Sequence, residues 1–197
     1  MNAARGRIGR PPGPHDDTLA RLLPAAERLL VDEGAAALTP TRLHAETGVS
    51  RATVYRNWPD PADLIEIMLA RATDPPPEDG FVGHTPTDLH QAGQWLLRQV
   101  QDRPFRAFVG VCLEYGRTSE RLAAAAEVFL AAILAPFRRV LAAAVDGGEL
   151  AGDVDQLVSE VAGPLMLDHV IRGRDLTPER VQTAIDHFLD HHLVAAR

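Results

Sequence analysis

The chain of 197 residues contains no lysine, so all 20 of its basic side chains other than histidine are arginine. It has one cysteine, Cys112, which excludes an intrachain disulfide and indicates a reducing compartment. The N-terminal residues lack the apolar core of a secretory signal, and the longest nearly apolar run, 128–137, is too short to span a bilayer. We therefore expect a cytoplasmic protein with no membrane partner.

Strand-forming residues are also sparse, whereas Ala and Leu abound and Pro and Gly fall between periodic stretches. This pattern predicts an all-α fold of about nine helices. Three consecutive prolines interrupt the chain within 74–85 and stiffen a connector there. The predicted domains are a flexible Arg-rich arm (1–14), an N-terminal helical domain (15–74), a linker (75–85) and a C-terminal helical domain (86–197).

The stretch 36–58 predicts two short helices joined by a tight turn. Thr39 is a suitable N-cap for the first helix, and Leu43 and Ala45 provide a short buried face for it. Gly48 permits the left-handed backbone of a tight turn, and Ser50 is a suitable N-cap for the second helix. The spacing is typical of two closely packed helices.

The second short helix, residues 51–58, has one apolar and one polar face. Val54 and Trp58 lie four residues apart and should face inward. The opposite side carries Arg, Thr, Tyr and Asn, which suit contact with base edges and phosphates in a major groove. We therefore interpret the pair as a helix-turn-helix. The candidate DNA contacts on the second helix are Arg51, Ala52, Thr53, Tyr55, Arg56 and Asn57.

The charge distribution agrees with this interpretation although the net charge is −7. Residues 1–59 hold eight arginines against six acidic residues, a balance of +2, so the remaining 138 residues carry −9. A mildly basic N-terminal part on an acidic body suits a DNA-binding protein whose body has another role.

The run GVSRATVYRNW strongly resembles the DNA-binding domain of TetR-family transcriptional regulators, in which GVS-x-x-T-hydrophobic-Y-x-x-aromatic forms the turn and the recognition helix. The resemblance covers the N-terminal third of the chain. It implies a ligand-responsive regulator, a repressor by family default, that binds a palindromic operator in double-stranded DNA as a homodimer.

The resemblance also implies roles for individual residues. Tyr55 and either Thr39 or Thr41 would contact phosphates, whereas arginine chemistry favours Arg51 or Arg56 for reading bases. The family usually has a phosphate-contacting lysine at the position of Pro61, so that contact is missing. Further candidate DNA contacts are Arg42 and Ser50.

The N-terminal arm carries Arg5, Arg7 and Arg10. Flexible basic arms beside helix-turn-helix domains can enter the minor groove. A solubilising tail would have the same composition, and both interpretations stay open.

The C-terminal domain is expected to bind an unidentified small-molecule effector, as the resemblance implies. A hydrophobic core would explain most of its aromatic residues equally well. The candidate pocket residues are Trp95, Phe108, Cys112, Tyr115, Phe129, Phe137, Met166 and His169.

The last two helices carry apolar stripes that could pair with a second copy of the chain, as in the family, although packing within one chain produces similar stripes. A helix-turn-helix reader needs two half-sites, which independently favours a twofold dimer. The candidate interface residues are Leu157, Val161, Leu165, Val181, Ile185, Phe188 and Leu189.

His187 and His191 lie four residues apart, as zinc ligands on one helix face would. They lack a clear third ligand, so no metal or other cofactor is predicted. No glycine-rich phosphate loop or nucleophile–base pair is present, and we do not expect an enzyme. The alternatives are a ligand- or metal-binding helical protein with a vestigial DNA-binding domain, and a small helical enzyme that uses the His187/His191 face.

Overall fold

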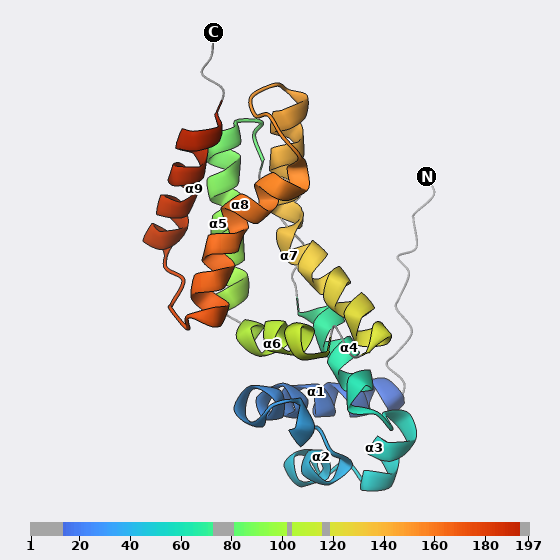
Figure 1. The fold of residues 1–197 in the computed structure, drawn as a ribbon. Helices are drawn as coiled ribbons and strands as arrows, with labels where there is room; N and C mark the ends of the chain where they lie inside the picture. Colours follow the sequence, from blue (N-terminus) through green and yellow to red (C-terminus); the bar gives the residue numbers. More distant parts are fainter. Residues whose placement is uncertain (1–13, 73–80, 102–103, 116–118, 194–197) are drawn as a thin grey trace, which may run out of the picture. The chain divides into compact units, whose positions relative to one another are not determined.

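The computed structural model describes residues 14–72, 81–101, 104–115 and 119–193, and these residues form helices and connecting turns without a strand (Figure 1). The all-α prediction is confirmed. The chain divides into two compact units, Met1–Leu64 and Ile65–Arg197. The predicted arm lies outside the described residues except for Pro14, as does most of the predicted linker, so those two boundaries stay predictions.

The N-terminal unit is built from three helices and a short connecting turn. The apolar residues of its first helix recur at intervals of three and four and are buried, namely Leu19, Leu22, Leu23, Ala26 and Leu30. The elements are α1 (Pro14–Glu33), the 3₁₀ turn η1 (Ala35–Ala37), α2 (Pro40–Thr47), α3 (Arg51–Asn57) and the start of α4 (Pro61–Arg71).

The buried face predicted for α2 is only partly correct. Leu43 is 1% exposed, but Ala45 is exposed to solvent. Two residues along an α-helix turn the side chain by about 200°, so Leu43 and Ala45 point to opposite sides. The small hydrophobic side of α2 therefore rests on Leu43.

The C-terminal unit is a bundle of longer helices. Figure 1 shows α5 and α9 running side by side, and α5 packs against both α9 and α7. Helix α7 contacts α5, α6 and α8. Helix α8 continues into a π-helical turn, η2. The elements are α5 (Thr85–Gln101), α6 (Phe105–Tyr115), α7 (Glu120–Asp146), α8 (Val154–Met166), η2 (Leu167–Ile171) and α9 (Pro178–His192).

The residues predicted for the dimer interface are covered within the single chain. Their side chains have exposed fractions of 0% to 6%, and Val181 with Ile185 faces Gly93 of α5. The alternative of intrachain packing therefore accounts for the apolar stripes, because these side chains offer little surface to a second copy. The residues concerned are Leu157, Val161, Leu165, Val181, Ile185, Phe188 and Leu189.

Helix α7 differs from the sequence expectation about membranes. Although the run 128–137 is short, the whole helix of 27 residues is long and apolar enough, by length and composition alone, to cross a membrane. The core helix of a soluble protein passes the same test, and 39% of the most apolar stretch of α7 is buried. Its buried residues include Leu122, Phe129 and Phe137, in a helix that packs on α5, α6 and α8.

The close approach of α5 and α9 at Gly93 can be tested with a pair of glycine substitutions. A Cβ at Gly93 would lie 2.5 Å from Val181 Cγ1 and 2.6 Å from Ile185 Cδ1, whereas a Cβ at Gly110 in α6 would meet nothing within 4 Å. Gly93→Ala should lower the free energy of unfolding by about 1 kcal/mol, because overpacking exceeds the gain in helix propensity. Gly110→Ala should raise it by up to about 1 kcal/mol. Chemical denaturation measures both, and a Gly93→Ala protein as stable as Gly110→Ala would contradict this packing.

Candidate nucleic-acid interface

The turn between α2 and α3 is fixed by glycine geometry and by local hydrogen bonds. Gly48 has φ 72° and ψ 1°, the left-handed conformation that glycine adopts at low cost, and its N–H donates to His44 O at 2.8 Å. Thr47 Oγ1 donates to Leu43 O at 2.6 Å and accepts from the Val49 N–H at 3.2 Å. The predicted role of Gly48 is confirmed.

Two further side chains hold this turn. Arg21 Nη2 on α1 donates to Thr47 O, the last carbonyl oxygen of α2, at 2.8 Å. His44 Nδ1 lies 2.9 Å from Val49 O and donates to it, because a carbonyl oxygen can only accept. The direction in which α3 leaves the turn is therefore set from α1 and from α2 together.

Both helices of the pair begin at the predicted N-caps. Thr39 Oγ1 accepts from the Arg42 N–H at 3.3 Å at the start of α2. Ser50 Oγ accepts from the Thr53 N–H at 3.1 Å at the start of α3, and the two hydroxyls lie 2.8 Å apart. Each cap satisfies one N–H that the first turn of a helix leaves without a partner.

The two faces of α3 differ as the sequence predicts. Val54 and Trp58, at the C-terminal end, are buried. Tyr55 is 67% exposed although its ring is large and mostly apolar. Arg51 and Arg56 are also exposed, and the guanidinium group of neither forms a hydrogen bond or ion pair with another described residue. This leaves one aromatic hydroxyl and two guanidinium groups available on the surface of α3.

Other candidate contacts already have partners in the chain. Asn57 is half-buried, and its Nδ2 donates to Thr53 O at 3.0 Å. Arg42 forms an ion pair with Glu33 of α1. Contact of these two side chains with DNA would first require these bonds to break, so the arginines of α3 are better placed to read bases. Ala52 and Thr41 are exposed and would contribute surface rather than charge.

In the C-terminal unit, several predicted pocket residues meet in one aromatic cluster. Phe105 connects Phe129 with His169. The centroid of its ring lies 5.9 Å from that of Phe129 and 6.1 Å from that of His169. Phe108 lies 6.1 Å from Phe129 in an edge-on arrangement. Phe105 was absent from the predicted pocket, and its position directly after Pro104 gave no signal that it would bridge α7 and η2.

The remaining predicted pocket residues are less clearly grouped. Trp95 is buried, and its Nε1 has no hydrogen-bond partner among the residues that the structure describes. Burial raises the pKa of Cys112 to about 11, which keeps the thiol protonated at neutral pH. Burial also raises the pKa of Tyr115, assisted by Glu114. Phe137 is fully buried and Met166 half-buried.

Two cavities among the described residues lie away from these side chains. One, of about 260 Å³, is bounded by the start of α5 and by α7, where buried Asp88 accepts from the N–H groups of Val82 and Gly83 at 2.8 and 2.9 Å. The other, of about 330 Å³, lies between α8 and α9. Since neither is lined by a predicted pocket residue, the effector-binding residues stay a prediction.

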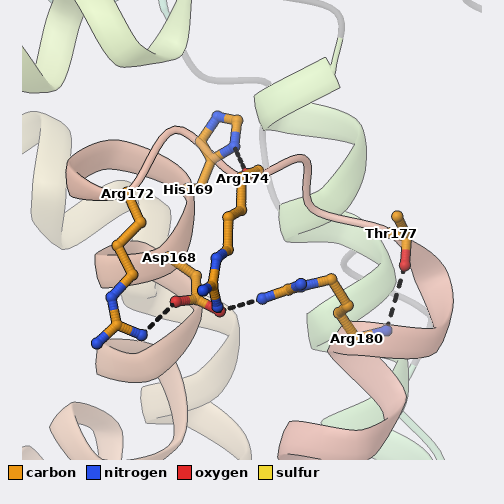
Figure 2. A network of polar contacts seen from close by, with 6 residues as sticks. All are labelled: Asp168, His169, Arg172, Arg174, Thr177 and Arg180. Carbon is orange, nitrogen blue, oxygen red and sulfur yellow. Dashed lines mark hydrogen bonds and ion pairs between the residues drawn. The ribbon is translucent and has the colours of Figure 1, made fainter.

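An arginine cluster adjoins the larger cavity (Figure 2). Asp168 accepts hydrogen bonds from Arg172 and Arg180, and Arg174 lies close by. Sequence reasoning did not find this cluster. The spacing of four between Asp168 and Arg172 on a helix was a signal, but contact with Arg180 depends on how α9 folds back on α8.

The histidine pair on α9 is close but lacks further ligands. The rings of His187 and His191 have centroids 4.3 Å apart, and His191 Nδ1 is 2.7 Å from His187 O. Within the described residues, no group of three or more His, Cys, Asp or Glu side chains could hold a metal ion. Nearby His192 Nε2 instead lies 2.8 Å from Glu160 of α8.

The role of Arg21 in the turn can be tested by hydrogen exchange. Arg21→Gln should speed exchange of the Gly48 and Val49 amides by about 2- to 10-fold, the effect expected for one lost hydrogen bond. Arg98→Gln, on α5 of the other unit, removes the same charge and should leave these amides unchanged. Exchange is measured by NMR, with the Leu43 amide, which bonds to Thr39 O, as internal reference. Equal exchange in both variants would contradict a positioning role for Arg21.

Comparison with known proteins covers both units. Residues 22–68 match the family of bacterial regulatory proteins of the tetR type, and residues 82–188 match the tetracyclin repressor-like C-terminal domain. The chain is 28% identical over 180 residues to an HTH-type transcriptional regulator of Mycobacterium tuberculosis, covering 89% of this chain and 87% of that protein.

Solved structures show the same fold at low sequence identity. A transcriptional regulator from Saccharomonospora viridis in complex with choline has a TM-score of 0.69 at 16% identity, covering 90% of this chain and 98% of that one. The flavonoid-responsive regulator FrrA has a TM-score of 0.59 at 23% identity, covering 91% and 99%. Regulators of this family are generally not enzymes. With a helix-turn-helix that exposes Arg51, Tyr55 and Arg56 and with family matches over both units, the chain belongs to the TetR family of DNA-binding transcriptional regulators.

Proposed function

We propose that the protein is a ligand-responsive repressor that binds a palindromic operator as a homodimer and has no enzymatic activity. The observation that carries the proposal is the division of α3 into two faces. Val54 and Trp58 anchor the helix in the N-terminal unit, while Arg51, Tyr55 and Arg56 remain on its surface. Two guanidinium groups and a phenol on one short helix suit a major groove, where arginine can bind guanine with two hydrogen bonds.

The DNA contacts would divide into base readers and phosphate contacts. Arg51 and Arg56 would read bases, because nothing else among the described residues binds their guanidinium groups. Tyr55 and the threonines at the start of α2 would hold phosphates. The arm arginines would supply minor-groove contacts, partly replacing the phosphate contact that is missing at Pro61.

The second unit would bring two readers to the spacing of duplex DNA. Recognition helices in a twofold dimer must lie about 34–36 Å apart to enter successive major grooves. Because the apolar stripes of α8 and α9 are buried within the chain, the partner would contact the outward residues of these helices. Domains 15–74 and 86–197, joined by the linker 75–85, would then divide DNA binding from dimerisation.

Effector binding would act on operator affinity through linkage between two sites. The DNA-binding conformation has one spacing of the recognition helices, and a second conformation has another. A ligand that binds the second conformation more tightly lowers the affinity for DNA, and the size of this effect is set by the ratio of the ligand's affinities for the two conformations. Structural neighbours that bind choline or respond to flavonoids support the capacity of this fold to take small molecules. The chain passes from one unit to the other within α4, which makes that helix the candidate for transmission. We place the protein in the cytoplasm, without a metal or other cofactor.

The proposal is tested by recovering the sequences that the purified protein binds from a pool of random duplexes. We expect an inverted repeat, and fluorescence anisotropy should show affinity that falls steeply with salt. A single half-site should bind much more weakly than the repeat. Recovery of no sequence above background would favour the alternative, a ligand-binding helical protein with a vestigial DNA-binding domain.

A base-reading role for Arg56 has a specific consequence. Arg56→Ala should reduce discrimination between the selected operator and single-base variants by about 1–3 kcal/mol at one position in each half-site. Arg28→Ala removes an exposed arginine of the same unit outside α3 and serves as the charge-matched control. Competition binding at fixed salt measures both. If Arg56→Ala weakened binding to all sequences alike, Arg56 would be a phosphate contact instead.

A further inference from the structure

The cavity between the start of α5 and the last turns of α7 has the size of a small metabolite. Its volume of about 260 Å³ equals that of about nine water molecules in the liquid, which is room for a molecule of roughly that many non-hydrogen atoms. Among the described residues, none from α8 or α9 lines it. Its apolar wall is one face of α7, formed by residues three and four positions apart, namely Val140, Ala143 and Ala144.

A negative charge is brought to this cavity by the turn that ends α7. Gly148 has φ 74°, and its N–H donates to Val145 O at 3.0 Å. The Glu149 N–H donates to Ala144 O at 2.9 Å. These two bonds form a Schellman motif, which folds the residues after a helix back onto its last turn. Glu149 therefore lines the cavity, and its carboxylate forms no hydrogen bond or ion pair with another described residue.

A positive charge is brought to the same cavity by α7 itself. The Arg139 guanidinium lies over the Phe81 ring, with Cζ 5.1 Å from the ring centroid, and both residues line the cavity. This cation–π contact holds the guanidinium at the cavity wall. A guanidinium carries five N–H donors in one plane, so it can bind a carboxylate with two parallel hydrogen bonds while another donor serves a second partner.

The third charged residue of the cavity, Asp88, is committed to the fold of the chain. Its side chain is only 4% exposed, and its two oxygens accept from the N–H groups of Val82 and Gly83 at 2.8 and 2.9 Å. It also lies at the N-terminal end of α5, where the helix dipole stabilises a carboxylate. The charges that remain for a ligand are one negative, on Glu149, and one positive, on Arg139.

We propose that this cavity binds a free α-amino acid with an apolar side chain. The ammonium group would lie against Glu149, where the C-terminal end of the α7 dipole also favours a cation. The carboxylate would lie against Arg139, and the side chain would cover Val140 and Ala143. An amine without a carboxylate would leave the guanidinium facing a cation, and a carboxylic acid without an amine would leave Glu149 facing an anion. A zwitterion satisfies both.

The proposal deepens the effector part of the proposed function, because it names a ligand class and a place for it, and only its regulatory consequence rests on that function. Binding is measured without DNA, so its failure leaves the DNA-binding proposal standing. The probe is L-leucine, titrated into the full-length protein by isothermal calorimetry. Isoamylamine, which is leucine without the carboxylate, and isocaproate, which is leucine without the ammonium group, are the ligand controls.

We expect saturable binding of leucine and binding of each analogue that is weaker by about 10-fold or more, the loss of one charge-assisted hydrogen bond. Arg139→Gln and Glu149→Gln should each weaken leucine binding by a similar factor. Two exposed residues provide matched controls, and Arg98→Gln on α5 and Glu127→Gln on α7 should leave the affinity unchanged. No saturable binding of leucine, an analogue that binds as tightly, or unchanged affinity in either Arg139→Gln or Glu149→Gln would overturn the proposal.

A second kind of variant tests the site without removing a charge. Ala143 lines the cavity and is exposed, so a larger side chain there fills the cavity without entering the core. In Ala143→Phe, leucine binding should be lost, while the circular dichroism spectrum and thermal unfolding stay those of the wild type. Unchanged leucine affinity in Ala143→Phe would place the ligand elsewhere and refute the site.

Discussion

The left-handed turn at Gly48 is the constraint on which the DNA-reading surface depends. A seven-residue helix is too short to be stable alone, so α3 takes its place from its attachments. Arg21, His44 and Thr47 hold the turn from outside, and Val54 with Trp58 anchors the helix from beneath. With both ends of α3 fixed in this way, its polar side chains are presented at the surface in one defined orientation.

In the proposed dimer, the acidic C-terminal unit would provide what a short reader helix lacks. One copy of α3 offers few contacts, so useful affinity for DNA requires a second copy at a defined distance. A unit that sets this distance can also regulate it, provided that a ligand distinguishes between two conformations. The buried aromatic cluster around Phe105 gives the same unit a packed interior.

Features that depend on neighbouring residues could be predicted from the sequence, and features that depend on distant ones could not. Thr39, Gly48 and Ser50 act within four residues of their own positions, and the predicted caps at Thr39 and Ser50 and the predicted turn at Gly48 are confirmed. The bond from Arg21 to Thr47 spans 26 residues and left no sequence signal. The apolar stripes of α8 and α9 could be recognised in the sequence. The pattern does not show whether the residues that pack on a stripe belong to the same chain or to a second copy. Here α5 supplies part of that cover, which periodicity alone could not reveal.

The central claim is that the exposed face of α3 touches DNA, and photo-crosslinking tests it most directly. A benzophenone amino acid would replace Tyr55 in one protein and Val128 of α7 in another, two side chains with the same exposed fraction of 67%. With a bound operator duplex, the probe at position 55 should crosslink to DNA and the probe at position 128 should not. Crosslinking from position 128 with none from position 55 would contradict the account.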